Sequence, residues 1–116
     1  MLQLTPQSRI FLAIEPVDFR KGMDGLAAVC RQVLVENPRS GALYVFRNRA
    51  GTTLKILVYD GQGYWLCTKR LSQGRFLNWP SAPGASAHLA AREFAVLLWN
   101  GSPVCAAMAE DWQPVR

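Results

Sequence analysis

The sequence is poor in the residues from which most catalytic and metal sites are built. It has a single histidine, His88, and only three cysteines, Cys30, Cys67 and Cys105, which lie far apart. These spacings match neither a zinc site nor a disulfide framework, and one histidine gives little support to a Cys-His or Ser-His-Asp arrangement. We therefore expect reduced cysteines, the first two buried, no metal and no cofactor. His88 is expected at a solvent-facing helix position.

Long hydrophobic runs are also missing. No apolar stretch is long enough to span a bilayer, and the N-terminus lacks the charged start and apolar core of a secretory signal. Half of the 116 residues are hydrophobic and 18% are charged, which favours a small folded domain over a disordered chain. The prediction is a cytoplasmic protein with one domain over residues 1–103 and a loosely ordered tail over residues 104–116.

Three short runs rich in β-branched and aromatic residues dominate the middle of the chain. They are Leu43–Arg47, Thr53–Asp60 and Tyr64–Arg70, separated by the glycine-containing breaks Asn48–Thr52 and Gly61–Gly63. Such short breaks join antiparallel neighbours, because a parallel return needs a dozen or more residues. The pattern predicts a three-stranded antiparallel meander.

If both breaks close symmetrically, counting residues gives the register and the faces. Lys55 is then opposite Val45 and Lys69, and Tyr59 is opposite Trp65. One face would carry exposed Tyr59 and Trp65. The other would be the core face, formed by Tyr44, Phe46, Leu54, Ile56, Val58, Tyr64, Leu66 and Thr68.

One further strand and two helices are predicted on either side of the meander. The run Arg9–Ile14 is typical of a strand, and apolar residues at three- and four-residue steps predict helices over Met23–Val35 and Ala87–Trp99. Residues 71–80 are compatible with a short edge strand, and residues 81–86 with a loop. The fold class is therefore α+β, in the order strand-helix-strand-strand-strand-helix, with both helices packed on the core face.

The positive charge points to a polyanionic partner. The formal net charge is +5, and the meander would bring many cations to one end of the sheet. Tyr59 and Trp65 could stack on unpaired bases or contact a partner protein. The alternative is a protein-interaction or dimerisation module without nucleic-acid contact. The predicted nucleic-acid-binding residues are Arg20, Lys21, Arg47, Arg49, Lys55, Lys69, Arg70 and Arg75.

A metal-dependent nuclease is the less favoured interpretation. Its site would need carboxylates that converge on a divalent cation, and the candidates are Asp18, Asp24, Asp60 and Glu93. Asp60 is expected at the end of the sheet remote from the cations, and Asp18 and Asp24 lie near basic residues with which they can pair. Turn and helix-cap roles account for these positions more simply. We expect no enzymatic activity.

Several motifs occur in one collinear order along the chain. They are Pro16–Leu26, Val45–Arg49, Leu54–Leu57, Asp60–Gly63, Lys69–Leu71 and Gly74–Phe76. In this order they resemble a known family, the TnpB-type accessory proteins of insertion sequences of the insertion-sequence-66 family. The resemblance covers roughly Ile10 to Leu98, with departures at Asn78, which precedes Trp79-Pro80, at Ala90 and after Leu98.

The resemblance implies a small bacterial protein that is made beside a separate transposase and is needed for movement of a mobile genetic element. Its expected partners are the DNA of the element ends, the transposase and other proteins of the same element, with a homodimer as a further possibility and no membrane.

Overall fold

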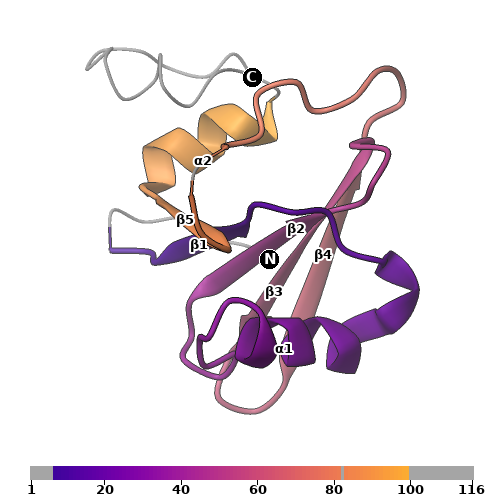
Figure 1. Cartoon of the computed structure of the whole chain (residues 1–116). Helices are drawn as coiled ribbons and strands as arrows, with labels where there is room; N and C mark the ends of the chain where they lie inside the picture. Colours follow the sequence, from indigo (N-terminus) through magenta and orange to yellow (C-terminus); the bar gives the residue numbers. More distant parts are fainter. Residues whose placement is uncertain (1–6, 82, 100–116) are drawn as a thin grey trace.

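The computed structural model describes residues 7–81 and 83–99. In this part the chain forms five strands, two α-helices and one turn of 3₁₀-helix (Figure 1). They are β1 (Ile10–Ala13), η1 (Phe19–Lys21), α1 (Gly22–Gln32), β2 (Leu43–Arg47), β3 (Thr53–Tyr59), β4 (Tyr64–Arg70), β5 (Ser86–Leu89) and α2 (Ala91–Leu98).

The strands form one mixed sheet in the order β4-β3-β2-β1-β5. The meander β2-β3-β4 is antiparallel, as the sequence predicted, and β1 was also expected. β1 lies parallel to β2, with η1 and α1 in the connection, and β5 pairs antiparallel to β1 on the far edge. The α+β class is confirmed.

The predicted register of the meander is wrong by one residue at both turns. Lys55 pairs with Phe46 and Thr68, not with Val45 and Lys69. The cause is that each loop closes with an even number of residues. Asn48 donates its N–H to the Thr53 carbonyl, and Asp60 donates to the Gly63 carbonyl, so one residue from each predicted break joins the ladder.

This shift redistributes the side chains because successive strand residues point to opposite faces. Lys55, Leu57 and Tyr59 share a face with Tyr44 and Phe46. Leu54, Ile56 and Val58 share the other face with Leu43 and Val45. Both faces are therefore core faces.

The two helices cover opposite faces, so the prediction that both pack on one face is wrong (Figure 1). α1 packs on the face of Tyr44 and Phe46. α2 packs on the face of Val45 and Ile56, which it covers through Phe94 and Leu97. The sheet is thus the middle layer of three, with a small apolar core on each side.

The three- and four-residue spacing that predicted the first helix implied one buried stripe, formed by Met23, Leu26, Cys30, Val33 and Leu34, and only part of it is buried. Leu26, Cys30 and Leu34 are buried as expected, but Met23 is 40% exposed and Val33 is 53% exposed. The α-helix ends at Gln32 rather than near the proline at position 38. Since the helix is shorter, the residues after Gln32 no longer follow its three- and four-residue steps.

The region before α2 was assigned incorrectly from the sequence. Ser86–Leu89 is a strand, and α2 begins only at Ala91, after the N-cap residue Ala90. Glu93 accepts a hydrogen bond from the Ala90 N–H at 2.8 Å and so caps the helix from its own first turn. His88 is exposed on β5, not on a helix, and its ring centroid lies 5.1 Å from that of Phe11.

Residues 71–80 form no strand. Two side chains nevertheless fix this segment to the sheet. Phe76 is buried in the core beneath α2, and the Trp79 indole N–H donates to the Ala13 carbonyl at 2.9 Å. The segment therefore closes one end of the α2-side core.

The thiols are free in the described part of the chain. Cys30 is fully buried, and burial raises the pKa of its thiol to about 12, so the thiol stays neutral. Cys67 is half-buried rather than buried. Cys105 and the predicted tail over residues 104–116 lie outside the described residues. No helix among the described residues is long and apolar enough to cross a membrane.

Candidate nucleic-acid interface

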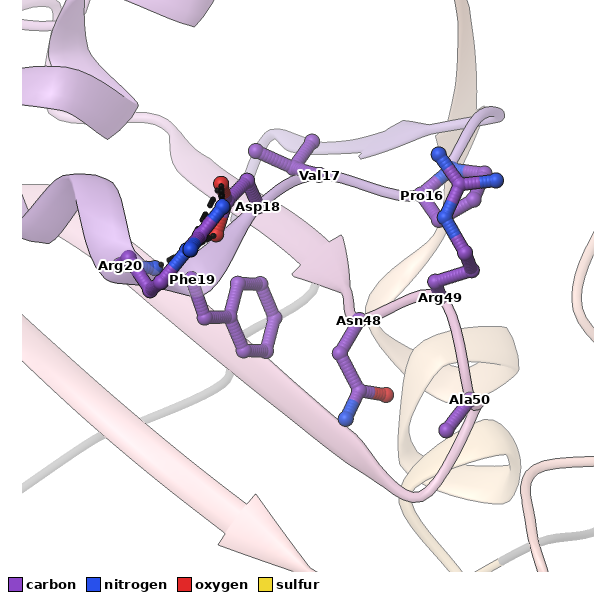
Figure 2. A pocket seen from close by; sticks show the side chains of 8 residues that line it. All are labelled: Pro16, Val17, Asp18, Phe19, Arg20, Asn48, Arg49 and Ala50. Atoms are coloured by element: carbon purple, nitrogen blue, oxygen red, sulfur yellow. Dashed lines mark hydrogen bonds and ion pairs between the residues drawn. The ribbon is translucent and has the colours of Figure 1, made fainter.

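A hollow with a volume of about 450 Å³ lies between two loops (Figure 2). One wall is the segment between β1 and α1, and the other is the turn between β2 and β3. The Val17 N–H donates to the Arg47 carbonyl at 2.9 Å and holds the two walls together. The lining residues are Pro16, Val17, Asp18, Phe19, Arg20, Asn48, Arg49 and Ala50.

Asp18 and Arg20 form a compact pair on the first wall. The Asp18 carboxylate accepts the Arg20 backbone N–H at 3.0 Å, which caps η1, and Nη2 of Arg20 at 2.8 Å. These hydrogen bonds, with the charge of the guanidinium, lower the pKa of Asp18 to about 2. The Arg20 side chain is 91% exposed. The pair therefore orders the loop, and the charges of its two side chains compensate each other.

Replacing Arg20 by alanine is expected to raise the pKa of Asp18 toward the ordinary value of about 3.9. In the folded protein the depressed pKa stabilises the loop above the unfolded pKa, and that contribution is lost as the pH falls toward 2. A carbon-detected NMR titration of the Asp18 carboxyl measures the change. Lys21→Ala is the control and should leave most of the depression, since Lys21 acts only through its charge. An unchanged Asp18 pKa in Arg20→Ala would contradict the pairing.

The second wall is shaped by Asn48. Its side-chain oxygen accepts the N–H groups of Thr52 and Thr53 at 3.0 and 3.2 Å, and its amide donates to the Thr52 hydroxyl at 3.1 Å. Gly51 adopts a φ of 74°, a conformation that other residues rarely take. The turn is thus rigid, and Arg49 is exposed at its tip.

The α1 face collects most of the predicted cations that remain accessible. Lys55 lies with its Nζ 5.0 Å from the ring centroid of Phe19, which lines the hollow. Arg70 pairs with Thr53 and so belongs to the same face and the same end of the sheet. Together with exposed residues of η1 and of the β2–β3 turn, these side chains form what we name the basic rim, which consists of Lys21, Arg49, Lys55 and Arg70, with Arg20 paired to Asp18.

Arg47 and Lys69 occupy the same end of the sheet but the opposite face, so the predicted single cluster is split. Arg47 donates to the Ile14 carbonyl at 3.1 Å and lies 5.5 Å from the Trp79 ring centroid. Lys69 donates to the Leu98 carbonyl at the end of α2 and lies 4.8 Å from the Trp99 ring centroid. Both charges serve the fold. Lys55 and Lys69, which were predicted to lie opposite each other, project from opposite faces of the sheet.

Arg75 lies beside the β2–β3 turn. The Phe76 N–H donates to the Gly51 carbonyl at 2.8 Å, and a Cβ placed on Gly51 would lie 3.6 Å from the Arg75 Cβ. Arg75 is exposed and adds positive charge beside this turn.

A comparison with protein families supports the resemblance that the motifs in both walls carry. Residues 8–105 match the family described as IS66 Orf2 like protein, the IS66 TnpB family. The chain belongs to this family. Membership associates it with the transposition of insertion sequences of the IS66 type.

Two relatives of the IS66 Orf2-like chain occur in Sinorhizobium fredii. The uncharacterized protein y4hO is 42% identical over 120 residues, which cover 100% of this chain and 98% of the relative. The uncharacterized protein y4jC is 40% identical over 90 residues, covering 78% of this chain and 76% of the relative. No solved structure matches the chain.

The structure gives physical reasons for residues of the motif that runs from the first wall into α1. A Cβ added at Gly25 would lie 2.2 Å from the Lys21 Cβ, so only glycine lets η1 continue so closely into α1. Gly22, between them, has a φ of 69°. In this member of the IS66 Orf2-like family the glycines therefore set the position of the first wall relative to the sheet.

The two predicted stacking residues do not share a face. Tyr59 lies on the α1 face, where its ring packs against Tyr64 at 5.1 Å and under the Arg39 guanidinium at 5.4 Å. Trp65 lies on the α2 face and is 54% exposed, and its indole N–H donates to Asp60 at 2.7 Å. A joint stacking platform of Tyr59 and Trp65 is therefore wrong.

Asp18 and Asp60 have the turn roles that the sequence favoured, whereas no side-chain cap bond is made at the start of α1, where a cap role was expected for Asp24. Asp60 accepts the N–H groups of Gln62 and Gly63 at 2.9 Å, and these bonds and the one from Trp65 lower its pKa. Asp24 lies in the first turn of α1, and Glu93 caps α2. Within residues 7–81 and 83–99, no three His, Cys, Asp or Glu side chains are grouped so that they could hold a metal ion.

Sequence reasoning did not find the hollow itself. Pro16, Phe19 and Asn48 were noted only as parts of motifs, because nothing in a one-dimensional pattern shows that two loops thirty residues apart form facing walls. The sequence feature that could have pointed to the hollow is that both loops contain motifs of the family.

Proposed function

We propose that this chain is a non-enzymatic accessory protein of IS66-type transposition that binds the phosphate backbone of DNA through the basic rim. The observation that supports this most directly is that some cations at this end of the sheet are bound within the fold, whereas others are exposed. Arg47 and Lys69 are held by carbonyls and aromatic rings, whereas the side chains of Lys21, Arg49 and Arg70 are exposed and, within the described residues, have no hydrogen bond or ion pair.

Folding alone gives little reason to place these cations together. Like charges at one end of a sheet repel each other, and a surface of this kind is stabilised when phosphates approach it. Lysine and arginine contacts to phosphate position a protein on the duplex without reading its sequence. The rim therefore supports binding to DNA of any sequence, with selection of the element ends left to the partner transposase.

The carboxylates support a non-enzymatic role. Phosphoryl chemistry at a metal centre needs acidic side chains that remain available as oxygen ligands. Asp18 is engaged by Arg20, Asp60 by its own turn and Glu93 by the start of α2. An accessory protein that holds DNA for a separate transposase fits these side chains better than a nuclease does.

A salt titration tests the DNA contact. If the four residues of the basic rim other than Arg20 each neutralise one phosphate, the logarithm of the affinity for duplex DNA falls against the logarithm of salt with a slope near 3.6 in magnitude. The affinity then drops about 150-fold between 50 and 200 mM salt. Fluorescence anisotropy with a labelled duplex of random sequence and one carrying an element end measures both values.

Two results would count against the proposal. Absence of binding at 20 mM salt, to duplex and to single-stranded DNA alike, removes the DNA contact and leaves the rim as a docking surface for an acidic region of the transposase. A slope near zero with measurable affinity indicates binding that does not use phosphate contacts.

A further inference from the structure

The outer edge of β4 is the largest unpaired backbone surface in the described part of the molecule. β4 has seven residues and is the last strand on its side of the sheet, where no described strand covers it. A long unpaired edge invites pairing with another strand, and charged residues or prolines commonly block it. Here charge is confined to one end, at Lys69 and Arg70, and the remainder is open.

The hydrogen bonds of the meander determine which backbone groups face outward. Asp60 donates to the Gly63 carbonyl and Leu71 donates to the Thr52 carbonyl, which places the hydrogen-bonded pairs at alternate positions of the ladder. Trp65, Cys67 and Lys69 thus direct their N–H and C=O groups toward β3. The residues whose groups point to the open edge are Tyr64, Leu66, Thr68 and Arg70.

We propose that this edge pairs with the β4 edge of a second copy of the chain, antiparallel and centred on Cys67. Only one antiparallel register pairs all seven residues of the strand with those of its copy, and it places Cys67 opposite Cys67 of the second copy. In that register each outward-facing residue meets another outward-facing one. Tyr64 pairs with Arg70 and Leu66 with Thr68, which gives about eight inter-strand hydrogen bonds.

The side chains are complementary in the same register. Arg70 lies opposite Tyr64 of the second copy, and Lys69 lies opposite Trp65, so each cation faces an aromatic ring and no cation faces another. A shift of two residues toward the basic end places Thr68 opposite itself, and a shift of four residues places Lys69 opposite itself. The fully overlapped register is therefore favoured by hydrogen bonding and by charge.

This surface shares Arg70 with the basic rim and is otherwise separate from it. Pairing would join two five-stranded sheets into one of ten strands through a two-fold axis, which makes the interface isologous. The two rims would lie at opposite ends of the paired strands. A strand pair is a small interface, so we expect association in the micromolar range, with a Kd of about 10 µM.

Disulfide trapping tests the register. Cys67 on the axis belongs to a non-hydrogen-bonded pair, whose Cα atoms approach to about 4.5 Å, within the range for a disulfide. In a Cys105→Ser chain treated with diamide, which takes up the two hydrogens of the thiols, we expect a covalent dimer linked through Cys67. Mass spectrometry identifies the linked cysteines. Cys30 should not form a disulfide, because it is buried.

A displaced thiol is the matched control. In a Cys67→Ser, Thr68→Cys chain the new cysteine faces Leu66 of the second copy, and the two new thiols are diagonal neighbours at about 7 to 8 Å. Cross-linking should be at least about tenfold slower than at position 67. Equal rates at the two positions would overturn the register.

A proline at the edge tests the interface without a thiol. Thr68 is exposed and its N–H points away from β3, so Thr68→Pro removes no bond of the single chain. We expect its dimer dissociation constant, measured by analytical ultracentrifugation, to rise at least about tenfold, with unchanged far-ultraviolet circular dichroism. A wild-type chain that sediments as a monomer up to about 200 µM, or a Thr68→Pro chain that associates as well as wild type, overturns the proposal.

Discussion

Replacing Phe94 by alanine is expected to lower the free energy of unfolding by about 3 to 5 kcal/mol. Phe94 is fully buried, and it is the largest side chain that α2 contributes to the core over Val45 and Ile56. Leu26→Ala on α1 should cost about 2 to 5 kcal/mol, because Leu26 is also fully buried, on the other face of the sheet. Urea denaturation followed by tryptophan fluorescence measures both.

The controls for these two variants are exposed residues in α1 and directly after it. Val33 and Met23 are 53% and 40% exposed, so Val33→Ala and Met23→Ala should change the free energy of unfolding by no more than about 0.5 kcal/mol. A small loss in Phe94→Ala beside a large one in Leu26→Ala would show that only one side of the sheet is a core. That result would contradict the three-layer arrangement.

The sequence was sufficient for the meander strands because their signal is local. Leu43–Arg47 is matched to the residue, and Thr53–Asp60 and Tyr64–Arg70 differ from the observed strands by at most one residue. The register could not be predicted, because it depends on whether Asn48 and Gly63 join the ladder. That choice is made by hydrogen bonds inside each turn, and a change of one residue exchanges the two faces of a strand.

β5 was not predicted from the sequence for a different reason. Ser86–Leu89 has four residues with no strong β propensity, and it is a strand because β1 offers it an open edge. Tertiary pairing of this kind overrides a weak local preference. The helix α2 was predicted correctly, but its start was placed too early, because the residues before it include apolar ones at helical spacing.

The site was predicted in part. The sequence correctly brought the cations to one end of the sheet, since a meander that runs up, down and up places the end of β2, the start of β3 and the end of β4 together. The sequence could not show that Arg47 and Lys69, unlike the other cations, are bound within the fold. Their partners are the Ile14 carbonyl and the Leu98 carbonyl, which belong to distant segments of the chain. Backbone acceptors of this kind carry no sequence signal.

That separation leads to the largest expected effect on DNA binding. A Lys21→Ala, Arg49→Ala, Arg70→Ala chain retains one of the four rim cations, so its salt slope should fall from near 3.6 to near 0.9. Between 50 and 200 mM salt the affinity of the triple variant should then change only about 3.5-fold, against about 150-fold for the wild type. Its stability should be nearly unchanged, because the three side chains are exposed.

Arg47→Ala and Lys69→Ala form the matched control, since they remove positive charge from the same end of the sheet. Each loses a hydrogen bond to a backbone carbonyl and a contact with a tryptophan ring, so each should lower the melting temperature. Their salt slopes should stay near 3.6 at a temperature where both are folded. If instead these two lower the slope by about one unit each and the triple variant keeps it, the phosphates contact the α2 face, and the basic rim has another role.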